Sequence, residues 1–176
     1  GGGDMPETDE VAVGLLGANL EANNGYYRIT RIFEGEPWTD AAGPLAAPGL
    51  DVAEGDYLIA IDGTETTTDV NPYVPLEGTA GEQVILTVND RPTAEGARTV
   101  TVVPTASEAE LRRIAWINHN RRVVDSLSNG RLGYVYIPDT GGGGYTRFTR
   151  NYFSQQDKDG IIIDERFNGG GSAADY

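Results

Sequence analysis

The chain has 176 residues, of which 39% are hydrophobic, so it is long enough to bury the core of one or two small domains. Its 27 acidic and 13 basic residues give a formal net charge of −14, and such a chain repels the phosphate backbone of nucleic acids. No apolar stretch approaches the roughly 20 residues that a helix needs to cross a bilayer. We therefore expect neither a nucleic acid nor a membrane as a partner.

Cysteine is absent, which excludes a disulfide framework and a thiolate metal site and is consistent with the cytoplasmic location that we predict. The sequence also shows no cluster of histidine and carboxylate ligands, so we expect no metal and no other cofactor. Residues 1–10 begin with three glycines and are acidic rather than signal-like. We interpret them as a tail or a cloning remnant.

Residues 11–104 have the pattern of a small β-rich domain. Apolar or alternating segments separated by turn residues predict strands at residues 11–20, 26–33, 57–61, 84–88 and 99–103. Two proline-containing segments, residues 38–50 and 71–76, predict two short helices. This pattern indicates a partly open β-barrel of mixed α+β class.

Residues 105–130 are predicted to form a connecting helix, from Ser107 to about Ser128. Ser107 and Glu110 have the spacing of a capping box, and Asn129-Gly130 is typical of a helix end. An apolar stripe runs along this helix through Leu111, Ile114, Ala115, Val124 and Leu127.

Residues 131–176 change to the order strand, helix, strand. Strands at residues 133–137 and 160–164 with a helix at residues 145–156 between them predict a parallel βαβ unit. Three isoleucines at residues 161–163 favour a strand that is covered on both faces. Because roughly 45 residues cannot cover both faces of a sheet, we interpret this domain as incomplete.

The last predicted strand leads into Gly169, Gly170 and Gly171. Glycines let the backbone turn sharply and present bare N–H groups, so a strand that ends in this way can hold negative charge. A phosphate loop would need a lysine and Ser/Thr at fixed spacing, or Gly-x-Gly-x-x-Gly, and neither occurs. An ordinary turn between a strand and a helix is the alternative.

Several stretches resemble a known family. Residues 14–18 resemble the carboxylate-binding loop of a PDZ domain of the protease-associated type, and residues 54–63 and 76–84 resemble its central strand and the passage into the next strand. Further stretches are similar to tricorn protease and its homologues: residues 35–38, 71–73, 88–90, 133–139 and 166–171. The resemblance covers nearly the whole chain, from a PDZ domain into the start of the tricorn catalytic domain.

The resemblance implies a serine peptidase that degrades oligopeptides downstream of the proteasome or an equivalent protease, and an incomplete βαβ unit of a crotonase-like catalytic domain. Tricorn-like enzymes use a Ser-His-Ser-Glu constellation that none of the resembling stretches contains, so we expect this chain alone to be inactive. By resemblance, the glycine loop supplies one backbone N–H of an oxyanion hole, from Gly169 or Gly170, or else from Gly171.

The resemblance also implies a peptide-binding groove. Its residues would be Leu15, Leu16, Gly17, Ala18, Asn19 and Leu20. An extended peptide would add a strand along residues 18–22, and the amides of Leu16, Gly17 and Ala18 would receive its terminal carboxylate. No cluster of basic residues adjoins this loop in the sequence, so we expect weak affinity.

Peptides and the remainder of the parent peptidase are the expected partners, and the full-length protein is expected to be a homo-oligomer. The alternative function is a stand-alone PDZ module whose βαβ tail is a non-catalytic oligomerisation surface.

Four local features invite a functional interpretation that we do not adopt. His119, the only histidine, is expected to be solvated or packed, because no nucleophile or acid accompanies it. Ser172 is expected to be a small loop residue. Asp164, Glu165 and Arg166 are expected to be surface charges or an ion pair rather than metal ligands, and residues 141–144 a loop.

Overall fold

The computed structural model describes residues 12–36 and 42–172. The chain divides into two compact units, one that ends at Ile114 and one that begins at Ala115. The division falls within helix α1 (Ala109–Leu127). The ends of this helix lie close to those predicted for the connecting helix. Within the described residues, no helix is both long enough and apolar enough to cross a membrane.

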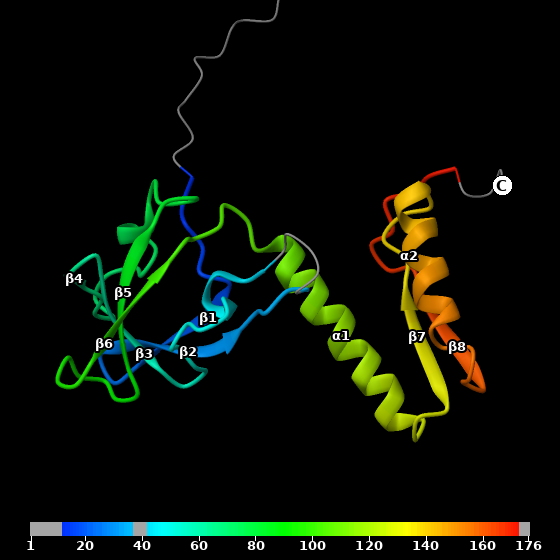
Figure 1. The fold of residues 1–176 in the computed structure, drawn as a ribbon, viewed down its shortest axis with the longest axis horizontal. Coiled ribbons are helices and arrows are strands. Elements are labelled where there is room, and N and C mark those ends of the chain that lie inside the picture. Colours follow the sequence, from blue (N-terminus) through cyan, green and yellow to red (C-terminus); the bar gives the residue numbers. More distant parts are fainter. Residues whose placement is uncertain (1–11, 37–41, 173–176) are drawn as a thin grey trace, which may run out of the picture. The chain divides into compact units, whose positions relative to one another are not determined.

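The first unit is built on an antiparallel sheet (Figure 1). Its strands, in spatial order, are β1 (Ala18–Asn23), β2 (Tyr26–Ile32), β3 (Tyr57–Ile61), β5 (Val84–Asn89) and β6 (Arg98–Val102), and β4 (Thr64–Glu65) pairs with β3. Asn24-Gly25 and Asp62-Gly63 all have positive φ, as a two-residue hairpin turn requires. The mixed α+β class is confirmed, and β1 lies at one edge of the sheet.

Two details of the prediction for the first unit are wrong. The first strand begins at Ala18 and not at residue 11, because Gly17 has a φ of 69° and interrupts the extended backbone. The two helices are single 3₁₀ turns, η1 (Pro44–Ala46) and η2 (Val74–Leu76), each with a proline at its first or second position. Trp38, at the start of the first predicted helix, lies outside the described residues.

The core of this unit gathers apolar side chains from β1, β2, β3, β5 and β6 and from the two 3₁₀ turns. Its buried members are Leu16, Ala18, Ile29, Leu45, Leu58, Ile61, Leu76, Val84, Leu86, Val88, Val100 and Val102. This core fixes the strand that follows the predicted carboxylate-binding loop.

The second unit contains the rest of α1, then β7 (Leu132–Tyr136), α2 (Gly142–Phe153) and β8 (Gly160–Asp164). Strands β7 and β8 pair in parallel, from Leu132 opposite Gly160 to Tyr136 opposite Asp164, so the predicted βαβ unit is confirmed. The end of α1 is also as predicted, because Gly130, with a φ of 77°, donates its N–H to the carbonyl of Asp125.

The expected burial of β8 is wrong for the chain as described. Ile162 is 42% exposed and Ile163 is 49% exposed. Successive strand residues point to opposite faces, so both faces of β8 are open to solvent. The apolar stripe of α1 is likewise buried only at Leu111 and Ile114, whereas Leu127 is 82% exposed.

Helix α2 begins three residues earlier than predicted, so most of the expected glycine loop at residues 141–144 is helical. The side-chain oxygen Oδ1 of Asp139 accepts hydrogen bonds from the N–H groups of Gly141 and Gly144, at 2.9 and 3.0 Å. This cap satisfies amides that a helix start would otherwise leave unpaired.

Candidate functional site

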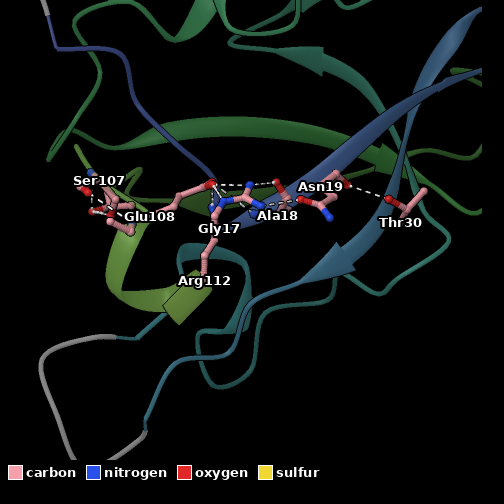
Figure 2. A network of polar contacts seen from close by, with 9 residues as sticks. Gly17, Ala18, Asn19, Thr30, Ser107, Glu108 and Arg112 are labelled. Carbon is pink, nitrogen blue, oxygen red and sulfur yellow. Dashed lines mark hydrogen bonds and ion pairs between the residues drawn. The ribbon is translucent and has the colours of Figure 1, made fainter. Parts of the chain in front are cut away.

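The predicted carboxylate-binding loop leads into the edge strand β1. The carbonyl oxygen of Gly17 accepts the N–H of Phe33, the residue that follows β2. The N–H groups of Gly17 and Ala18 point elsewhere, toward the start of α1 (Figure 2). Both residues are buried, so these amides need a partner within the protein.

That partner is the carboxylate of Glu108. Its Oε1 atom accepts a hydrogen bond of 2.8 Å from the N–H of Gly17 and one of 3.3 Å from the N–H of Ala18. Glu108 is only 6% exposed. Two of the three amides that were expected to receive a ligand's terminal carboxylate therefore already hold a carboxylate of the same chain.

Arg112 completes this arrangement from the next turn of the helix. Its Nε donates to Oε2 of Glu108 at 2.8 Å, and its Nη1 donates to Oδ1 of Asn19 at 2.8 Å. Its Nη2 reaches the carbonyl oxygen of Ala18 at 3.4 Å, and the guanidinium lies 4.5 Å from the ring centre of Phe33. A single basic side chain thus lies beside the loop, although Arg112 is distant in sequence, and the expected weak affinity stays a prediction.

The remaining predicted groove residues play different parts. Leu16 packs in the core, and its N–H has no acceptor among the described residues. Leu15 pairs with Thr105 as an isolated bridge, and Leu20 packs against the core. Tyr73 lies near the Glu108 carboxylate: burial, and next the negative charge of Glu108, raise the pKa of its hydroxyl, while Arg112 opposes the rise.

The glycine loop after β8 uses two of its three amides internally. Gly169 donates its N–H to the carbonyl of Pro138 at 2.9 Å, and Gly170 donates to Oδ1 of Asn168 at 2.7 Å. The N–H of Gly171 has no acceptor among residues 12–36 and 42–172, and Gly171 is exposed. The geometry therefore favours Gly171 over the two glycines that the sequence put first, while the oxyanion role of the loop stays a prediction.

Gly171 must be glycine for reasons of packing. Its φ is 148°, and a Cβ atom there would lie 2.4 Å from the carbonyl carbon of Thr140 and 2.5 Å from the nitrogen of Gly141. The loop thus lies directly against the start of α2, and the carbonyl of Gly170 accepts the N–H of Thr140. This contact fixes the position of the open amide.

An ion pair holds the end of β8 just before the loop. Arg166 contacts both carboxylate oxygens of Asp164 through Nε, at 3.0 Å each, and Tyr134 donates its hydroxyl to the same carboxylate at 2.6 Å. The Arg166 hydrogen bonds hold the pKa of Asp164 well below its usual range despite burial, and burial raises the pKa of Tyr134. The guanidinium of Arg166 also lies 4.9 Å from the ring of Trp116. The predicted ion pair is confirmed.

The other catalytic candidates remain apart from these sites. His119 is exposed, in agreement with the expectation of a solvated histidine, and Ser172 is an exposed loop residue. Over residues 12–36 and 42–172, no three histidine or carboxylate side chains are grouped so that they could hold a metal ion.

Comparison with known proteins gives a consistent result. Residues 14–107 match the family described as "Tricorn protease PDZ domain". The chain is 39% identical over 160 residues to a "Tricorn protease homolog 1" from Streptomyces coelicolor, and the aligned region covers 90% of this chain and 15% of that protein. It is 31% identical over 171 residues to a "Tricorn protease" from Thermoplasma volcanium, and the aligned region covers 97% of this chain and 16% of that protein.

The fold agrees with this match. A crystal structure of the tricorn protease aligns with 96% of this chain, at 25% identity and a TM-score of 0.84, and the aligned region is 16% of that protein. The chain thus spans about one sixth of the length of the solved relative and a similar share of the curated ones.

Proposed function

Because the chain belongs to the tricorn protease PDZ family, we propose that it is part of a cytoplasmic serine peptidase that degrades oligopeptides downstream of the proteasome or an equivalent protease. The first unit is its PDZ domain, and the second unit is the start of its crotonase-like catalytic domain. The full-length protein is a homo-oligomer.

The observation that carries this proposal is the exposed amide of Gly171. Acyl transfer places negative charge on the carbonyl oxygen of the substrate, and a fixed N–H aimed at that oxygen stabilises the transition state. Gly171 supports such a role because its amide has no acceptor in the described part of the chain, while its backbone is held against Thr140 and Gly141. The nucleophile and the general base come from other parts of the enzyme.

The role proposed for the first unit is peptide recognition. Strand β1 ends the sheet, so its outer edge can accept an extended peptide as an additional strand. Leu15, Leu16, Gly17, Ala18, Asn19 and Leu20 form or adjoin this edge.

The alternative is a stand-alone PDZ module that oligomerises through the second unit. The exposed isoleucines Ile162 and Ile163 favour it, because they give β8 two apolar faces that another chain could cover.

Hydrolysis of fluorogenic peptides separates these two functions. We expect the full-length protein to cleave the peptides and to be inactivated by a fluorophosphonate, which labels reactive serines, while the 176-residue chain is inactive and unlabelled. A full-length protein that neither cleaves nor reacts with the probe would support the binding module. Clear turnover by the 176-residue chain that His119→Ala abolishes would contradict the assignment of the catalytic groups to other segments.

A further inference from the structure

The start of α1 fills the place at which a PDZ domain would hold the last residue of a peptide. Oε1 of Glu108 accepts the N–H groups of Gly17 and Ala18, as a terminal carboxylate would. Arg112 donates to the carbonyl of Ala18, as a peptide N–H would in a β-ladder. One side-chain pair thus satisfies both backbone groups of Ala18.

The Glu108 carboxylate is held firmly in this place. Glu108 is 6% exposed and its two oxygens are both hydrogen-bonded, one to the loop and one to Arg112. A second carboxylate in the same place would have to displace Glu108 or lie against it, and two like charges in one buried site repel strongly. The site is therefore closed to a peptide's terminal carboxylate while Glu108 is in place.

The outer edge of β1 continues beyond this closed end. Leu20 is half-buried, and residues 21–23 of the strand are exposed. β1 terminates the strand order, so no other strand of the sheet covers this edge within the described residues. The backbone here can still pair with an extended peptide.

We propose that Glu108 and Arg112 make the first unit a reader of internal extended peptide segments, which pair with β1, and not of free carboxy-termini. This inference rests on the proposed peptide recognition and specifies its ligand. Glu108 is a specificity-determining residue, because it occupies two of the amides that would otherwise donate hydrogen bonds to a terminal carboxylate.

Peptide binding tests the proposal on the 176-residue chain. The probe is a pooled library of N-acetylated octapeptides, made once with free carboxylates and once with terminal carboxamides. We expect the original chain to bind both forms equally. Glu108→Ala frees the amides of Gly17 and Ala18 together with Arg112, so it should bind the free acids at least about tenfold more tightly than the amides.

Glu110→Ala is the matched control, since Glu110 lies on the same helix and pairs with Arg113 rather than with the loop. We expect it to bind both peptide forms equally. Glu108→Gln keeps the size of the side chain, so it guards against loss of folding, and it should shift the preference toward free acids in the same direction as Glu108→Ala.

Amide hydrogen exchange tests the occupation of the loop without any peptide. In the original chain and in Glu110→Ala, the N–H groups of Gly17 and Ala18 should be protected, and Glu108→Ala should exchange them at least about tenfold faster. Unchanged protection would overturn the role of Glu108. A tenfold preference of the original chain for free acids would overturn the proposed specificity, whereas failure of every variant to bind any peptide would overturn the peptide recognition on which it rests.

Discussion

Deleting the N–H of Gly171, without changing any side chain, is the sharpest test of the proposed oxyanion hole. Proline cannot serve, because its φ of about −65° conflicts with the φ of 148° at Gly171. Semisynthesis of the full-length enzyme with glycolic acid in place of Gly171 turns the amide into an ester, which removes the donor. The same exchange at Gly170 gives a matched control.

The Gly171 ester should mainly lower kcat, whereas the Gly170 ester should mainly lower stability. At Gly171 the ester removes no hydrogen bond that Gly171 donates among the described residues, but it weakens the Gly170 carbonyl as the acceptor of the Thr140 N–H. Stability should therefore fall by less than about 1 kcal/mol, while kcat should fall about 10²- to 10³-fold with little change in KM. At Gly170 the ester removes the 2.7 Å bond to Asn168, which should cost about 0.5–1.5 kcal/mol of stability and leave kcat within a few-fold.

Peptidase kinetics and thermal unfolding of both esters decide between these outcomes. A Gly171 ester with normal kcat would refute the assignment of the donor. A Gly170 ester that loses kcat as strongly as the Gly171 ester, while remaining folded, would show that the internal bond of Gly170 gives way during catalysis and that the donor was misassigned.

Two further predictions concern the second unit. Asp164→Asn should cost about 1–3 kcal/mol of stability at pH 7, because Arg166 and Tyr134 lose a charged partner. The pKa of Asp164 in the folded chain lies below the unfolded value of about 3.9, so its contribution to stability is complete above about pH 5 and is lost as the pH falls further. Melting curves of the original chain and the variant, followed by Trp116 fluorescence, should therefore converge toward about pH 2. Gly144→Ala should destabilise α2, because its Cβ would lie 1.8 Å from a backbone oxygen of the preceding loop. Gly142→Ala, with nothing within 4 Å, should stabilise the helix by less than about 1 kcal/mol, since Gly142 is its first residue; equal melting temperatures for the two variants would contradict the packing of this turn.

The parts of the fold that the sequence predicted well depend on neighbouring residues. Asp62-Gly63 and Asn129-Gly130 end their elements because their own backbones reach positive φ, whatever surrounds them. The errors arise where distant contacts decide. The exposure of Ile162 and Ile163 depends on what covers a sheet, and β-branched side chains alone do not supply that information.

The site shows the same limit. Glu108 and Arg112 are four apart and follow Ser107, so a helix start with an ion pair could be expected from the sequence. Their contact with Gly17 could not, because 91 residues separate Glu108 from that amide. Nor could the sequence distinguish the three glycines after β8, since the acceptors for the first two come from Pro138 and from a particular rotamer of Asn168.

Burial explains why the amides of Gly17 and Ala18 have an acceptor within the chain while the amide of Gly171 has none among the described residues. Gly17 and Ala18 are buried, and a buried N–H without a partner costs about 1–3 kcal/mol, so the fold supplies Glu108. Gly171 is exposed, and water can satisfy its N–H at little cost until a substrate oxygen replaces it. A backbone donor is kept available for a ligand at the lowest cost where solvent reaches it. That condition holds for Gly171 and fails for Gly17 and Ala18.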